Sequence, residues 1–278
     1  MWLASFPKSG NTWVRAFLAN YLTDSAEPVD INTLSSFAVG DMRIEPYLRQ
    51  SDRPAEQLTP ADIDRLRPLV HRATAELHPG SIFVKTHSVI GRAGGTPLIT
   101  PDVTGGAVYV VRNPLDVAVS FADHYGLTLD QVAKAICFNR LRIDPRPDQV
   151  TQHLGDWSTH VSSWLEAPGL HRHVVRYEDL AAAPTEAFAA IVRFLKVPLE
   201  AERLERAIAH CNFAVLAAQE REHGFRERSR SAERFFRSGQ VGGWRTLLAA
   251  RHVEAITAFH AEVMRQFDYI DADGALRV

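Results

Sequence analysis

The N-terminal stretch Trp2–Trp13 has the sequence WLASFPKSGNTW. Its apolar run, Trp2–Phe6, predicts a short buried strand, and the following residues, Pro7–Asn11, predict a turn. Apolar side chains then recur at helical spacing over Thr12–Tyr21, so this segment predicts a helix. The chain therefore begins with a strand, a tight turn and a helix.

The turn carries the groups that bind an anion. Successive backbone N–H groups at the positive end of a helix dipole attract phosphate or sulfate. Lys8 adds positive charge, and Ser9 and Thr12 add hydroxyl groups. The lysine of an ATP-type loop ends a glycine-rich run, directly before a magnesium-binding hydroxyl, whereas here the lysine comes first. The sequence predicts a phosphate or sulfate site, with an ordinary strand-helix turn as the alternative.

The same order of strand and helix recurs along the chain. Short apolar runs predict further buried strands over Ser81–Lys85, Gly106–Val111 and His173–Tyr177. The last two are followed by helical segments, Pro114–Tyr125 and Pro184–Leu195. This alternation predicts an α/β fold in which a central, mostly parallel sheet has helices on both faces.

The rest of the chain predicts helices and two loops. The loops are expected over Asn32–Gln57 and over Arg221–Arg237, where six arginines and three glutamates give 6 − 3 = +3. The second loop is either a solvated surface or a cationic segment that folds over a bound anion. Helical spacing of apolar residues predicts the remaining helices, Leu58–Leu77, Leu129–Leu141, Val150–Glu166, Ala201–His210 and Arg245–Phe267.

The composition is typical of a globular protein. The 278 residues are 46% apolar and 23% charged, with a net charge of −2. We therefore expect a single domain over residues 1–278 and, without a general basic field, no nucleic-acid partner. Cys137 and Cys211 cannot form a disulfide framework, and no Cys/His spacing suits a metal. Because the sequence shows neither a signal peptide nor about 18 consecutive apolar residues, we expect no membrane span and a cytoplasmic location.

A second anion site is predicted within Val110–Ser120, which has the sequence VVRNPLDVAVS. Arg112 follows the end of a buried strand, where open α/β sheets bind ligands. Ser120 lies two turns into the following helix, so a phosphate fits between the two side chains. The alternative is that Arg112 forms an internal ion pair with Asp116.

A candidate base follows another strand end, in the segment Val84–His87 with the sequence VKTH. A near-neutral imidazole is suited to accept the proton of an attacking hydroxyl. The chain has 12 histidines, and His87 is distinguished from the others by its neighbours.

Together these segments resemble the sulfotransferases of the soluble cytosolic and bacterial type, which use 3′-phosphoadenosine 5′-phosphosulfate (PAPS). The resemblance covers residues 2–248, nearly the whole chain, and its six segments occur in the family's order. They are Phe6–Trp13, Lys85–His87, Arg112–Ser120, Trp157–Trp164, Arg176–Leu180 and Phe235–Trp244. The first strand, turn and helix then correspond to the family's P-loop-like phosphosulfate-binding unit.

The resemblance implies catalytic and donor-binding residues at the matching positions. The catalytic residues would be His87, as the base, with Lys8 and Lys85. The 5′-phosphosulfate would be held by Lys8, Ser9, Gly10, Asn11, Thr12 and Trp13. The 3′-phosphate would be held by Arg112, Ser120, Arg237 and the backbone of Gly239, and the adenine by Trp13, Tyr177 and Phe213.

The last of the six segments, Phe235–Trp244, which we call the late segment, departs from the family pattern. Ser238 stands where a second basic residue is usual, and Gly243 stands where an aspartate often precedes Trp244. We expect a weaker grip on the 3′-phosphate, or compensation by an arginine from Arg226–Arg234. The family's dimerisation signature is largely absent after Trp244, so the oligomeric state stays open.

The resemblance implies in-line transfer of a sulfuryl group from PAPS to an acceptor hydroxyl, leaving 3′,5′-bisphosphoadenosine (PAP), without a metal. A magnesium-dependent kinase and a non-catalytic module that binds a nucleoside bisphosphate are the alternatives. The acceptor is expected to be a small molecule or natural product: a phenol, an alcohol, a sugar, a lipid or a peptide. Its site should be open and depend on the two loops. The Arg/Ala-rich composition indicates a bacterial source.

Overall fold

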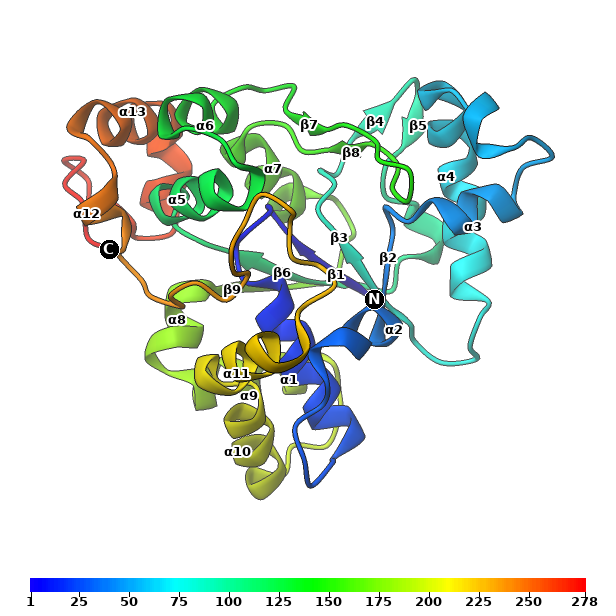
Figure 1. Ribbon diagram of the computed structural model, residues 1–278, viewed down its shortest axis with the longest axis horizontal. Helices are drawn as coiled ribbons and strands as arrows, with labels where there is room; N and C mark the ends of the chain where they lie inside the picture. Colours follow the sequence, from blue (N-terminus) through cyan, green and yellow to red (C-terminus); the bar gives the residue numbers. More distant parts are fainter.

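Five parallel strands form the central sheet of the computed structural model, which describes residues 1–278 (Figure 1). Their order is β2-β3-β1-β6-β9, so the first strand of the chain lies in the middle. The predicted parallel α/β sheet is confirmed. The strands are β1 (Trp2–Ser5), β2 (Ala38–Gly40), β3 (Phe83–Thr86), β6 (Ala107–Val111) and β9 (Arg172–Arg176).

Helices cover both faces of this sheet, because successive strand side chains point to opposite sides. In β1, Trp2 and Ala4 join one hydrophobic cluster, whereas Leu3 joins the other. The first cluster includes α5 (Pro114–Tyr125), α6 (Leu129–Ile136), α7 (Trp157–Glu166) and α13 (Ala250–Gln266). The second includes α1 (Asn11–Thr23), α9 (Pro184–Phe194), α10 (Ala201–His210) and α11 (Phe213–His223). In Figure 1 the two groups lie above and below the sheet.

Shorter elements complete the structure. Two small hairpins pair β4 with β5 and β7 with β8. No helix combines the length and the apolar character that crossing a bilayer requires. The remaining helices are α2 (Leu34–Phe37), α3 (Ile44–Arg49), α4 (Pro60–Ala75), α8 (Tyr177–Ala182) and α12 (Trp244–Leu247). The hairpin strands are β4 (Arg92–Ala93), β5 (Thr96–Pro97), β7 (Arg142–Ile143) and β8 (Gln152–His153).

The prediction of a loop over Asn32–Gln57 is wrong. It contains two helices and an edge strand, Ala38–Gly40, which pairs with β3. Three residues give too short a pattern for a strand to be recognised from alternation, and the pairing with β3 defines it. The expected loop Arg221–Arg237 is also shorter, because its first three residues end α11.

Three predicted helices differ from the structure in their bounds. The segment Val150–Glu166 becomes helical only at Trp157, where the Asp156 side chain accepts a hydrogen bond from the Thr159 N–H. The preceding residues, Gln152 and His153, form a strand instead. Similarly, Leu129–Leu141 is helical only as far as Ile136, and Arg245–Phe267 is divided between α12 and α13.

Candidate active site

The carboxyl ends of β1, β3, β6 and β9 are followed by residues that line one cavity of about 990 Å³. This is the edge at which parallel sheets bind ligands. Lys8, Arg112 and Arg237, from three distant segments, share this cavity. Except for Ser9, every residue assigned a role from the sequence lines it, namely Lys8, Gly10, Asn11, Thr12, Trp13, Lys85, His87, Arg112, Ser120, Tyr177, Phe213, Arg237 and Gly239.

The turn after β1 presents unpaired hydrogen-bonding groups. Gly10 has φ +107°, and an added Cβ would lie 2.7 Å from the Tyr177 ring, so both conformation and space require glycine. The Asn11 side chain donates to the Leu3 carbonyl at 2.8 Å and fixes the turn to β1. The buried Ser9 hydroxyl has no protein partner, and the N–H groups of Gly10, Asn11 and Thr12 at the start of α1 have no backbone acceptor. The turn can therefore donate several hydrogen bonds to an anion.

Lys8 lies beneath the loop that follows α11. Its Nζ is 3.4 Å from His124 Nδ1 and 3.9 Å from the centre of the Phe235 ring. Burial lowers the pKa of Lys8 to about 7; the Asp123 carboxylate opposes this change, and the Lys85 charge adds to it. A bound anion would offset both burial and cationic repulsion and so favour the charged form.

A carboxylate that the sequence did not indicate joins this loop to the floor of the cavity. Glu227 accepts hydrogen bonds from both terminal nitrogens of Arg15, at 2.7 and 2.8 Å, and from Lys85 Nζ at 2.9 Å. Burial alone would raise the pKa of Glu227, but the Lys85 and Arg15 charges hold it below its usual value. Arg15 is completely buried among apolar residues of α1. A charged residue on an apolar helix face was the signal that could have revealed this network.

The imidazole of His87 is held in one tautomer. Its Nδ1 lies 2.8 Å from the Ser5 carbonyl oxygen, which can only accept, so Nδ1 carries the proton and Nε2 has the free lone pair. Burial, followed by the nearby Lys85 charge, lowers the pKa of His87 well below 6.5. The ring is therefore neutral near pH 7 and can accept a proton at Nε2.

Two further side chains support the backbone of His87. His160 Nε2 donates to the His87 carbonyl at 3.0 Å. The Tyr109 hydroxyl in turn donates to His160 Nδ1 at 2.8 Å. This relay joins the candidate base to the buried strand β6, and no sequence pattern indicated it.

Arg112 is positioned by backbone and aromatic contacts. Its guanidinium lies 4.1 Å from the centre of the Tyr177 ring and donates to the carbonyls of Lys8 and Gln240, at 3.3 and 3.0 Å. Its Nε has no partner. The expected alternative, an ion pair with Asp116, is long at 4.0 Å. The guanidinium thus keeps donor capacity toward the cavity.

Aromatic side chains lie beside this arginine. The Tyr177 hydroxyl donates to the Gly239 carbonyl at 3.1 Å, and the centres of the Tyr177 and Trp13 rings are 5.6 Å apart. Gly239 has φ +62°, and any Cβ there would collide with the Phe213 ring. Tyr177 and Phe213 thus both contact Gly239, and Trp13 packs against Tyr177. The three aromatic residues expected to bind the adenine therefore lie together.

Asp116 organises the glycine-rich late segment. Its carboxylate accepts hydrogen bonds from the N–H groups of Gly242, at 2.8 Å, and Trp244, at 3.1 Å. The sequence suggested a missing aspartate directly before Trp244. The structure supplies a carboxylate at this segment from α5, more than a hundred residues earlier.

Comparisons with known proteins agree on a family. A family model described as "Sulfotransferase domain" matches residues 1–268. Sulfotransferase 1A1 of Canis lupus familiaris is 25% identical, over 94% of this chain and 82% of its own length. Cytosolic sulfotransferase 13 of Arabidopsis thaliana is 26% identical, over 91% and 73%. A bacterial source stays a prediction, because these relatives are eukaryotic.

Solved structures share the fold. Retinol dehydratase, crystallised with androsterone and the inactive cofactor PAP, has a TM-score of 0.65 at 20% identity, covering 98% of this chain and 82% of that one. Mouse sulfotransferase SULT7A1, crystallised with PAP, has a TM-score of 0.61 at 18% identity, covering 96% and 84%.

Proposed function

Because this chain belongs to the sulfotransferase family, we propose that it transfers the sulfuryl group of PAPS to a hydroxyl of a small-molecule acceptor. One observation carries the proposal: three cations from distant segments, Lys8, Arg112 and Arg237, line the same cavity as His87. A donor with phosphate groups at both ends of a nucleoside needs such a divided set of cations. The solved neighbours with PAP support the same donor.

The donor is proposed to lie across the strand ends. Lys8, the Ser9 hydroxyl and the unpaired N–H groups of residues 10–12 would bind the 5′-phosphosulfate. Arg112, Ser120, Arg237 and the Gly239 backbone would bind the 3′-phosphate. Trp13, Tyr177 and Phe213 would contact the adenine. The orphaned Ser9 hydroxyl and Arg112 Nε support this placement, because both are buried donors that await a partner.

In the proposed reaction, the neutral imidazole of His87 acts as the base. As the acceptor oxygen attacks sulfur, its proton passes to His87 Nε2, and an oxygen–sulfur bond forms while the bond from sulfur to the 5′-phosphate oxygen breaks. Lys8 stabilises the negative charge that develops on that leaving oxygen. Lys85 lies on β3, two residues before His87, and supports the sulfuryl group electrostatically. Positioning and charge carry the rate, as in phosphoryl transfer.

We also propose a single domain over residues 1–278. The two hydrophobic clusters pack on opposite faces of one sheet and share its strands, which supports one folding unit. The family assignment, in turn, argues against the kinase and the non-catalytic module.

The experiment that tests the base replaces His87. His87→Ala should lower the single-turnover transfer rate by about 10²–10⁴-fold, while the calorimetric affinity for PAP stays unchanged. His78→Ala, at an exposed histidine, is the matched control. Unchanged turnover would remove His87 from the mechanism, and lost PAP binding would assign it a structural role. A wild-type protein that does not bind PAP would refute the donor itself.

A further inference from the structure

We infer that the acceptor carries an oxyanion, a carboxylate, phosphate or sulfate, close to the hydroxyl that is sulfurylated. The inference rests on the proposed function and names the chemical class of its acceptor. It comes from the part of the cavity wall whose residues are not among those proposed above to bind the donor.

The cavity has room for a second molecule beside the donor. Its volume of about 990 Å³ is at the upper end of the range of roughly 300–1,000 Å³ for ligand pockets. Besides the residues proposed to bind PAPS, it is lined by Met42 and Arg43 after β2, by residues 146–149 of the β7–β8 hairpin, and by residues 225–231 after α11. These segments form the acceptor wall.

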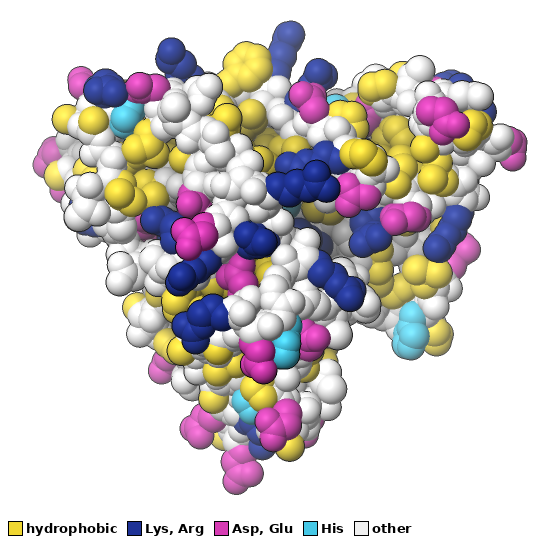
Figure 2. Space-filling model, in the orientation of Figure 1, with side chains coloured by type: hydrophobic (Ala, Val, Ile, Leu, Met, Phe, Trp, Pro, Cys, Tyr) yellow, Lys and Arg dark blue, Asp and Glu magenta, His cyan; other side chains and the backbone are white.

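Three arginines of the acceptor wall have neither a carboxylate within salt-bridge distance nor any hydrogen bond from the side chain. They are Arg146, Arg226 and Arg230, all exposed to the cavity. Other arginines nearby are paired: Arg43 with Glu45 at 2.8 Å and Arg142 with Asp144 at 3.0 Å. Lys and Arg side chains gather across the middle of the face in Figure 2, over the loop that follows α11.

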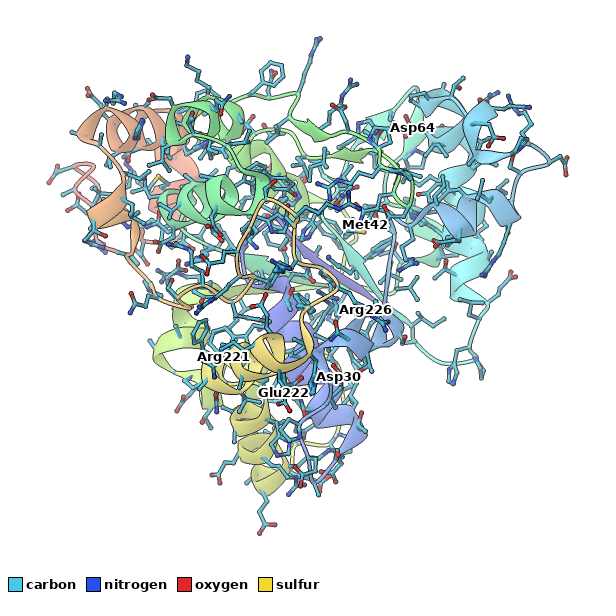
Figure 3. All side chains as sticks on the ribbon, viewed as in Figure 1. Asp30, Met42, Asp64, Arg221, Glu222 and Arg226 are labelled. Atoms are coloured by element: carbon cyan, nitrogen blue, oxygen red, sulfur yellow. The ribbon has the colours of Figure 1, made fainter.

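The loop that carries two of these arginines is held in place. The Arg226 N–H donates to Asn32 Oδ1 at 2.9 Å, and the next residue is the Glu227 that bonds Arg15 and Lys85. Arg228 folds back and donates to two carbonyls of its own loop. In Figure 3, Arg226 and Met42 lie near the centre of the view, on segments that converge over the strand ends. The free guanidinium groups are therefore presented by an anchored loop.

Two of the three carboxylates that line the cavity are already engaged. Glu227 is neutralised by two cations, and Asp116 accepts from two backbone N–H groups. The third, Asp148, forms no ion pair, and it contributes less than the hydrogen bond to Glu45 to the raised pKa of Arg43. An apolar acceptor would cover Arg146, Arg226 and Arg230 without giving them a partner, which is costly. An oxyanion would satisfy them through charge-assisted hydrogen bonds.

The test compares matched pairs of hydroxyl compounds on protein saturated with PAP. The pairs are 4-hydroxyphenylacetate and its amide, glucose 6-phosphate and glucose, and glucose 6-sulfate and glucose. Calorimetry gives the dissociation constant of each. The pairs also distinguish carboxylate from phosphate and sulfate as the favoured group. The variants are the triple substitution Arg146→Gln, Arg226→Gln, Arg230→Gln and, as the matched control, Arg142→Gln on the same hairpin.

In at least one pair, we expect the anionic member to bind about tenfold or more tightly than the neutral one. The triple variant should lose this preference and keep its affinity for PAP, and the control should keep both. The inference is overturned if the neutral member binds as tightly in every pair, if no anionic member binds, or if the triple variant retains the preference. If the wild-type protein fails to bind PAP at all, the proposed function fails together with the inference.

Discussion

The two proposed phosphate sites of the cavity are built in opposite ways. The 5′ site is one continuous turn, residues 8–13, between a strand and the helix that follows it. The 3′ site gathers Arg112, Ser120, Arg237 and Gly239, which span more than a hundred residues of sequence. Local backbone geometry therefore shapes the first site, whereas tertiary contacts shape the second.

The difference lies in what holds each cation. Lys8 is carried by its own turn, which Asn11 attaches to β1. Arg112 instead depends on the Tyr177 ring and on the Gln240 carbonyl of the late loop. We expect substitutions at the 5′ site to lower the transfer rate more than the affinity for PAP. Substitutions at the 3′ site should lower the affinity for PAP more than the transfer rate.

Between the two phosphate sites, the largest effect is expected from Lys8→Met, which keeps the apolar stem under Phe235 and removes the charge. Because Lys8 is proposed to stabilise the leaving oxygen, the single-turnover rate should fall by about 10²–10³-fold. Lys134→Met, at an exposed lysine of α6, is the control. A larger loss in PAP affinity than in rate would erase the distinction between the two sites.

A smaller effect is expected from Arg112→Ala at the 3′ site. Losing the charged fork should weaken PAP binding by about 10–100-fold, with little change in the rate constant at saturating PAPS. Arg112→Lys should recover only part of the affinity, since an ammonium cannot reproduce a bidentate contact. Calorimetry with PAP measures both variants, and full recovery by lysine would contradict the geometry.

The protonation of Lys8 should make donor binding depend on pH. Its pKa of about 7 in the free protein means that the ammonium is charged below this pH and neutral above it. Since an anion binds the charged form, affinity for PAP should fall as pH rises above about 7, by at most about tenfold per unit. Calorimetry across this range should show the extra slope in the wild-type protein but not in Lys8→Met. Equal slopes would show that Lys8 does not titrate there.

The smallest effect is expected from Asp116→Asn. The amide oxygen can still accept one hydrogen bond, but it lacks the charge that holds the N–H groups of Gly242 and Trp244. Loosening of the late segment should weaken PAP binding by about fivefold, the equivalent of roughly 1 kcal/mol. Asp179→Asn, at an exposed aspartate, is the control. An unchanged affinity would mean that the segment keeps its place without this carboxylate.

Elements with a strong local pattern were predicted well from the sequence. The helix over Pro114–Tyr125 has the predicted bounds, because Asn113 caps its start and Gly126 ends it in the left-handed region. The strands β1, β3, β6 and β9 were located to within about two residues. The edge strand β2 was missed, because three residues carry too little pattern and only pairing with β3 makes them a strand.

The candidate site likewise combines residues that are adjacent in sequence with residues that only the fold brings together. The role of the Lys8 turn can be argued from residues that are adjacent in sequence, since one strand-turn-helix unit brings them together. Glu227, His124 and Asp116 could not be assigned in this way. Their partners, Arg15 and Lys85, Lys8, and the N–H groups of Gly242 and Trp244, are 116 residues or more away along the chain.

The sequence by itself determined the parallel α/β sheet, the anion-binding turn and the family resemblance, because periodicity, turn residues and ordered motifs are local properties. Only the tertiary structure decided that Glu227 joins the loop after α11 to Arg15 and Lys85, and that Asp116 holds the glycine-rich segment Gly239–Trp244. It also decided that unpaired arginines face the same cavity as His87. These features depend on distances between segments that fold together from opposite ends of the chain, and such distances follow from packing around the sheet.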